Sequence, residues 1–267
     1  MKRSHPAAHI LFLVLLFSLF ALPAGILVLV GLAPGWRFPD LWPERFSFAG
    51  IEFLITHRDR IAVSLASSFL YSLATVFVTL CMCLTPAAAF ARQRFPGKRL
   101  LEALVLTPAL VPPMTFAMGL HMVFIKLSLA DTAAGVVLIL ALFSYPYMFR
   151  ALVAGFQTMG QGYRVCAGNL GAGNIAIFRQ VELPLLVPAM IAGGSVVFLV
   201  AFSEYFLVFL MGGGNVPSFT GFLMPLLASS NRSLAAILTL IFLVLPILLF
   251  FLLDWCLMRS YRKKGMI

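Results

Sequence analysis

Six apolar segments, each long enough to cross a lipid bilayer as a helix, dominate this sequence. A helix needs about 20 apolar residues to cross the hydrocarbon core, where backbone groups must be satisfied within the segment. The chain is 62% hydrophobic and only 10% charged, so a bilayer is the expected solvent. The sequence therefore predicts an all-α integral membrane protein with six transmembrane helices, at His9–Leu32, Ile61–Ala91, Leu101–Ile125, Ala133–Phe156, Leu183–Leu210 and Leu234–Leu257.

Prolines interrupt two of these segments. The third contains Pro108, Pro112 and Pro113, and the fourth contains Pro146. Because proline lacks a backbone donor and its ring collides with the preceding turn, we expect the third segment to be broken and the fourth to be kinked. Since no composition shift or linker marks a second domain, residues 1–267 are predicted to form a single transmembrane domain.

Positive charges are distributed unevenly between the two sets of connecting loops. The set that includes both chain ends is rich in lysine and arginine: Lys2, Arg3, Arg92, Arg94, Lys98, Arg99, Arg164, Arg179, Arg259, Arg262, Lys263 and Lys264. The other set carries fewer basic residues: Arg37, Arg45, Arg58, Arg60, Lys126 and Arg232. Acidic residues in the same loops offset most of this charge: Asp40, Glu44, Glu52, Asp59 and Asp131. Cytoplasmic loops are the positive ones, so both termini are predicted to be cytoplasmic. The same bias accounts for the net charge of +10 without nucleic acid as a partner.

A short polar stretch joins the fourth and fifth apolar segments. Residues 165–184 read VCAGNLGAGNIAIFRQVELP. Gly171 and Gly173 permit a tight change of direction between helical pieces. Pro184 suits the first turn of a helix, where a missing amide costs little. The stretch is therefore predicted to be a turn between short helices that leads directly into the fifth span.

This stretch resembles the cytoplasmic "EAA" loop of binding-protein-dependent ABC importer permeases. That pattern is Glu-Ala-Ala, three residues, Gly, nine residues, Ile, any residue, Leu-Pro. Matching or favoured residue types stand at Ala167, Leu170, Gly171, Ala172, Phe178, Leu183 and Pro184, and Val181 replaces the Ile. The departures are Val165 in place of the Glu and Cys166 in place of the first Ala. In that family the loop forms short coupling helices that dock on a cytoplasmic ATPase.

The resemblance extends over about residues 60–257. The stretch Ser68–Arg92, followed by the basic turn Arg94–Arg99, looks like the family's second span and the turn after it. The stretch Thr107–Pro113 looks like its third span, and Leu127–Thr132 followed by Tyr145–Tyr147 looks like the next turn and the fourth span. The resemblance implies a permease subunit in a bacterial inner membrane, with the coupling loop at 157–184. It implies a second permease subunit, identical or not, two cytoplasmic ATPases and an extracytoplasmic solute-binding protein as partners.

No Gly-x-x-x-x-Gly-Lys-[Ser/Thr] phosphate loop occurs in the chain. Phosphate loops of this type cradle nucleotide phosphates, so this chain is not expected to be an enzyme. ATP and magnesium would be bound by the partner subunits, and no cofactor or metal is expected here. Because Val165 removes a carboxylate that relatives pair with a basic group of the ATPase, we expect apolar contacts to contribute more to docking.

Glu204 stands alone within the fifth apolar segment, in Ser203-Glu204-Tyr205. Charged residues inside a membrane are costly, and they usually face a pathway or a partner. Two interpretations remain open, a pathway residue or a structural pairing. The pathway interpretation favours a polyamine or another small polar or cationic solute. A stand-alone secondary transporter or channel is the alternative function, although such proteins carry more intramembrane charges than this chain.

Overall fold

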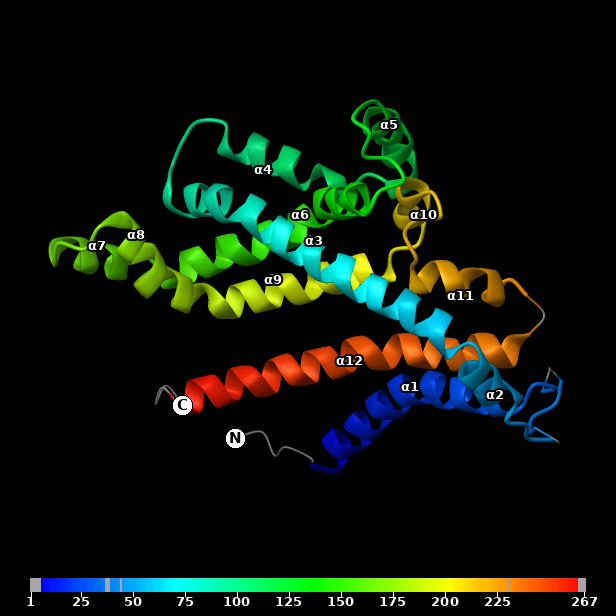
Figure 1. Cartoon of the computed structure of the whole chain (residues 1–267). Helices are drawn as coiled ribbons and strands as arrows, with labels where there is room; N and C mark the ends of the chain where they lie inside the picture. The colour runs from blue at the N-terminus through cyan, green and yellow to red at the C-terminus, as the bar shows by residue number, and fades with distance from the viewer. Residues whose placement is uncertain (1–5, 37–38, 44, 230, 264–267) are drawn as a thin grey trace. The chain divides into compact units, whose positions relative to one another are not determined.

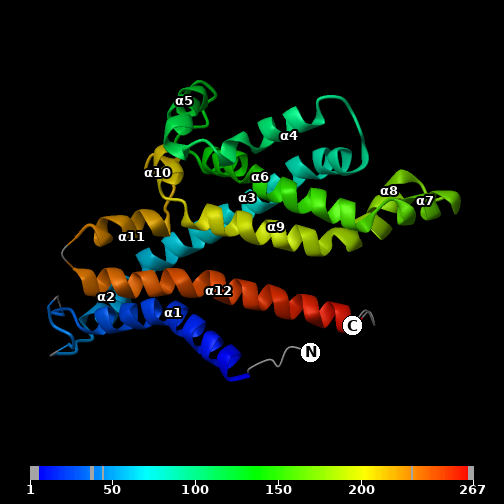
Figure 2. The same cartoon turned by 180° about the vertical axis from the view of Figure 1, so that it is seen from behind.

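The computed structural model describes residues 6–36, 39–43, 45–229 and 231–263, and within these ranges every regular element is helical. Five of the charges used to predict orientation, Lys2, Arg3, Arg37, Glu44 and Lys264, lie outside the described residues. The chain packs as two units (Figures 1 and 2). One comprises residues 1–62 and 222–267, and the other comprises residues 63–221.

The predicted transmembrane segments are all found as helices. Five helices are long and apolar enough to cross a bilayer, and a bent pair would make a sixth. This pair consists of α4 (Lys98–Leu106) with a 3₁₀ turn (Thr107–Ala109), and α5 (Pro113–Lys126), which meet at 93°. The bend lies at Pro108, Pro112 and Pro113, so the predicted break is confirmed. By contrast, α6 (Ala133–Met159) continues without interruption through Pro146.

The first unit pairs α1 (Pro6–Leu32) with α12 (Arg232–Lys263), and α2 (Ala49–Thr56) lies against α12. Gly31 allows the close approach of α1, because a Cβ there would stand 2.9 Å from Ile237 Cγ1. The Ser233 hydroxyl donates to the Gly31 carbonyl oxygen at 2.5 Å. Small residues and interhelical hydrogen bonds of this kind hold helices together where lipid is as apolar as the side chains.

The second unit is built around α6, which packs along α9 (Leu183–Ser203). Glycines set the spacing between them: a Cβ at Gly155 would lie 2.5 Å from Ala189 Cβ, and one at Gly193 would lie 2.9 Å from Ala151 Cβ. Much of α3 (Arg58–Arg92) also belongs here, and Gly194 faces its Val76. This close backbone contact brings α6, α9 and α3 together within the second unit.

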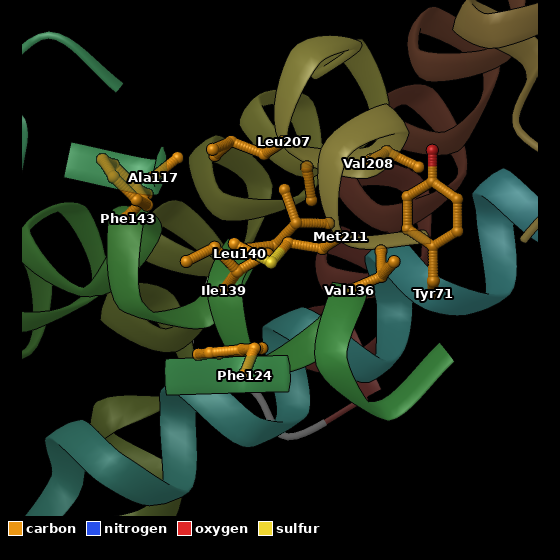
Figure 3. Packing of buried hydrophobic residues seen from close by; sticks show 11 residues of the cluster. Tyr71, Ala117, Phe124, Val136, Ile139, Leu140, Phe143, Leu207, Val208 and Met211 are labelled. Atoms are coloured by element: carbon orange, nitrogen blue, oxygen red, sulfur yellow. The ribbon is translucent and has the colours of Figure 1, made fainter. Parts of the chain in front are cut away.

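Two buried clusters lie along α6. One joins it to α5 and to α10 (Phe206–Gly212) and includes Ile139, Leu140, Leu207 and Met211 (Figure 3). The other joins α6 to α3 and α9 and includes Met148, Phe149, Leu152 and Leu186. Because α6 contributes to both clusters, it is the central helix of the unit.

The fifth span was predicted as one helix over Leu183–Leu210, and this prediction is wrong at its C-terminal end. The helix ends at Ser203, Glu204 is extended (φ −76°, ψ 122°), and α10 begins at Phe206. The Thr220 hydroxyl donates to the Glu204 carbonyl oxygen at 3.2 Å, at the start of α11 (Phe219–Leu227). A backbone carbonyl freed from the helix has thus found a tertiary partner, which local apolarity does not reveal.

Candidate functional site

The loop between α6 and α9 contains three short helical pieces. After Gly160, whose φ of +68° ends α6, the chain forms α7 (Gly162–Asn169), α8 (Asn174–Ile177) and a π-helical segment (Phe178–Glu182) that leads into α9. Both views show α7 and α8 at one end of the α6–α9 pair, with α5 and α10 at the other end (Figures 1 and 2). The predicted arrangement of short helices before the fifth span is confirmed.

Gly171 closes α7 in a conformation that favours glycine. Its φ is +83°. The Gly171 amide donates to the Gly168 carbonyl at 2.9 Å, and the Ala172 amide donates to the Ala167 carbonyl at 3.1 Å. These two bonds form a Schellman motif, which satisfies carbonyls at the helix end and places a left-handed residue after the cap. The predicted tight turn is therefore a defined one, and it fixes the direction in which the chain leaves α7.

The loop exposes four large apolar side chains. Tyr163 is 60% exposed, Val165 56%, Leu170 83% and Ile175 77%. We call these four residues the loop apolar patch. Val165 and Leu170 are positions of the predicted coupling loop that the family pattern singles out, whereas Tyr163 and Ile175 were not singled out. Large apolar side chains exposed on a connecting loop are typical of a surface that a partner covers.

Most of the other predicted loop residues are half-buried. Cys166 and Pro184 are exposed, and the half-buried ones are Ala167, Ala172, Phe178, Val181 and Leu183. Within residues 160–184 the buried residues are Ile177 and Glu182. Ile177, rather than the neighbouring Phe178, therefore provides the most buried apolar contact between the loop and the body of the unit.

Glu182 forms a buried ion cluster that sequence reasoning missed. Its Oε1 accepts a hydrogen bond from Arg92 Nη2 at 2.7 Å and another from Arg164 Nη1 at 2.8 Å. The Glu182 side chain is 3% exposed, and those of Arg92 and Arg164 are 18% and 36% exposed. Arg164 also donates to Asn174 Oδ1 at 3.0 Å. Because a buried carboxylate needs partners, this geometry fixes the positions of all three charged side chains.

The π-helical segment is explained by a proline two residues after its end. Pro184 is the second residue of α9 and has no amide to donate. A proline within a continuous helical path removes a hydrogen bond and collides with the preceding turn, and a wider π turn is one way to accommodate it. The prediction that Pro184 lies in the first turn of the fifth helix is confirmed, and the π-helical segment joins this helix to α8 in one continuous helical path, from Asn174 to Ser203. The wide turn places Glu182 where it meets both arginines.

The predicted pathway residues lie at the break after α9. Ser203 is exposed and donates to the Leu199 carbonyl oxygen at 2.7 Å. The Glu204 carboxylate accepts a hydrogen bond from the Leu207 amide at 3.2 Å, at the start of α10. The Tyr205 ring stacks on Phe209 with centroids 5.7 Å apart. Glu204 thus has a structural partner within the chain, and its role on a pathway stays a prediction.

Comparison with known proteins gives one family match and several partial relatives. Residues 82–260 match the family described as "Binding-protein-dependent transport system inner membrane component". The probable sulfate transport system permease protein cysT of Nephroselmis olivacea is 31% identical over 153 residues, 53% of each chain. The molybdate/tungstate transport system permease protein WtpB of Thermococcus kodakarensis is 27% identical over 148 residues, 55% of this chain and 60% of the relative. The chain therefore matches only a little over half the length of these relatives.

A solved structure shares the fold over almost the whole chain. It is described as a bacterial ABC transporter involved in the import of the acidic polysaccharide alginate. The similarity has a TM-score of 0.70 and covers 95% of this chain and 98% of the other, at 17% sequence identity. At this low sequence identity, the similarity demonstrates the fold alone.

Proposed function

Because the chain belongs to the family of binding-protein-dependent transport system inner membrane components, we propose that it is the permease subunit of an ATP-driven importer. The observation that carries this proposal is the loop apolar patch, on a loop that also contains the Schellman turn and the buried side chain of Ile177. A loop with short helices that presents apolar side chains suits a helix-in-groove contact with a partner. The partner we propose is a cytoplasmic ATPase, which supplies ATP and Mg²⁺ binding.

The proposed assembly contains two permease subunits, two ATPases and a solute-binding protein on the outer side of a bacterial inner membrane. In this arrangement the chain ends and the 157–184 loop face the cytoplasm. The residues of this chain line half of the solute pathway and transmit movement from the ATPases, and none of them hydrolyses ATP. Family membership does not favour the alternative of a stand-alone secondary transporter or channel.

For the substrate we propose an inorganic oxyanion. Relatives at 27–31% identity carry the names of sulfate, molybdate and tungstate permeases. The argument for a polyamine or another cation depended on Glu204 as a pathway residue, and its carboxylate accepts a hydrogen bond from the Leu207 amide instead. Uptake of labelled sulfate, molybdate and spermidine, each compared between a wild-type strain and one deleted for this chain, distinguishes the classes. Loss of spermidine uptake alone would refute the oxyanion proposal.

Leu170→Asn tests the docking proposal, with Leu41→Asn as a matched control. Both leucines are highly exposed, at 83% and 86%, and both lie outside helices. Burial of a leucine side chain contributes about 1.5–3 kcal/mol, so we expect Leu170→Asn to weaken ATPase binding by about tenfold or more. Leu41→Asn should retain the ATPase. Equal ATPase recovery with wild type, Leu170→Asn and Leu41→Asn permeases would contradict docking at this patch.

A further inference from the structure

The Glu182 ion cluster joins parts of the second unit that are far apart in the sequence. Arg92 is the last residue of α3, Arg164 lies in α7, and Glu182 ends the π-helical segment before α9. Both arginines contact the same carboxylate oxygen, Oε1. One nearly inaccessible atom therefore connects the loop helix α7 to the ends of two apolar helices.

Both arginines of the cluster make further contacts. The Arg92 guanidinium lies over the Phe156 ring of α6, 4.7 Å from its centroid. Gln161, immediately before α7, donates from Nε2 to the Arg92 carbonyl oxygen at 3.4 Å. Arg164 reaches forward to Asn174 at the start of α8. The loop is thus tied to the end of α3 by both a backbone carbonyl and a charged side chain.

The electrostatics favour movement of these elements together. If α7 shifted without α3, Glu182 would lose one guanidinium while its carboxylate stayed buried, and removal of one partner from a buried ion pair is strongly unfavourable. Charge-assisted hydrogen bonds are also short and directional. A displacement of α7 is therefore transmitted most easily when Arg164, Glu182 and Arg92 keep their contacts and α3 follows.

We propose that Glu182 is a positioning residue that transmits movement of α7 to the C-terminal end of α3 and to the start of α9. The proposal rests on the proposed function, because the movement of α7 comes from the ATPase docked on the loop apolar patch. It assigns the docking role to the exposed residues of the loop and the transmission role to the buried carboxylate. A purely structural cluster would stabilise the loop without affecting how much transport each ATP supports.

The test uses the complete transporter, reconstituted in lipid vesicles with its ATPase and loaded binding protein. Glu182→Gln removes the charge and keeps the shape. Arg164→Gln removes only the ion pair between α7 and Glu182 and leaves the Arg92–Glu182 pair intact. The side chain that it changes is 36% exposed. Arg164→Lys keeps a positive charge at that position. Glu102→Gln, on α4, is the matched control, since this half-buried carboxylate forms no ion pair with any residue that the structure describes.

Two quantities are measured: the amount of ATPase that co-purifies, and solute uptake per ATP hydrolysed. We expect Glu182→Gln and Arg164→Gln to keep the ATPase and to lower uptake per ATP by about fivefold or more, the usual range of coupling between sites. Arg164→Lys should retain more coupling than Arg164→Gln, and Glu102→Gln should match wild type. If Glu182→Gln does not fold, the two Arg164 variants decide the question.

Three outcomes would overturn the proposal. Wild-type uptake per ATP in Arg164→Gln would show that the Arg164–Glu182 ion pair does not transmit movement of α7. Loss of the ATPase from Arg164→Gln would assign the residue to docking. Equal loss in Arg164→Gln and Arg164→Lys would show that the charge does not matter. A wild-type complex that neither binds an ATPase nor imports solute would instead contradict the proposed function, and that result is separate.

Discussion

Replacement of Gly171 by valine tests whether the ATPase recognises the shape of the loop. The φ of +83° at Gly171 is unfavourable for any residue with a Cβ, and especially for a β-branched one. A Cβ at this position would have no atom within 4 Å, so the free permease offers no steric obstacle. The cost is therefore conformational, about 1–2 kcal/mol for a left-handed non-glycine residue, and Gly171→Val should lie at the upper end.

If docking requires the Schellman turn, this cost appears in the affinity for the ATPase. Since about 1.4 kcal/mol is a tenfold change in affinity, we expect Gly171→Val to weaken binding by about 5- to 30-fold. Gly171→Asn should weaken it less, because asparagine tolerates this backbone region. The assay is titration of purified ATPase against detergent-solubilised permease, with permease yield measured alongside.

Gly173→Val is the matched control for side-chain bulk. Gly173 lies two residues further along the same loop and has an ordinary φ of −69°, and a Cβ added there would also meet no atom within 4 Å. We expect this variant to bind the ATPase more tightly than Gly171→Val does. Equal affinities for the two valine variants, or for Gly171→Val and Gly171→Asn, would refute the conformational explanation.

The remaining predictions concern stability and orientation. Gly135→Ala should lower the thermal unfolding midpoint by an amount equivalent to about 1–3 kcal/mol. The reason is that its Cβ would overlap the Leu129 carbonyl oxygen, which also accepts a hydrogen bond from the Thr132 hydroxyl. Gly119→Ala, whose Cβ meets no atom within 4 Å, should be neutral or stabilising in the same melting assay. A reporter that is active only outside the membrane should be silent when fused after Ile267 and active when inserted in the 33–60 loop, and the reverse pattern would contradict the orientation predicted from the positive charges.

Much of this fold is encoded in local sequence patterns. The apolar segments are long and nearly free of charge, so their identity as helices follows from the solvent alone. The bend between α4 and α5 follows from three prolines, and the turn after α7 follows from Gly171. Each of these features depends on residues that are neighbours in the chain, which is why the sequence was sufficient to predict them.

The Glu182 cluster depends on residues that are not neighbours. Arg92 lies 90 positions and Arg164 lies 18 positions from Glu182. Each is an ordinary loop or helix-end charge when the sequence is read locally, and the family pattern leaves the position of Glu182 open. One signal was present: Glu182 immediately precedes an apolar segment, where a carboxylate requires a partner. The sequence could indicate that need, but only the packing of α3 against the loop identifies the partners.

Glu204 shows how the same rule can point to a different role. An isolated carboxylate in an apolar segment suggested a pathway residue, whereas the structure places a helix break there and a cap on the Leu207 amide. Both interpretations satisfy the requirement that an intramembrane charge has a partner. They differ in what the partner needs, because a backbone amide needs only an acceptor and a cationic solute needs the negative charge.

Glu204→Gln and Glu204→Ala therefore separate the two roles. Glutamine keeps an oxygen that accepts the Leu207 amide, and alanine removes it. If capping is the role, Glu204→Gln should match wild type in uptake and melting, while Glu204→Ala should lose about 0.5–2 kcal/mol, the usual cost of a lost cap. Melting curves and uptake are measured on both variants. Should Glu204→Gln lose uptake while its melting midpoint stays at the wild-type value, the charge itself acts on the solute, and the capping explanation is insufficient.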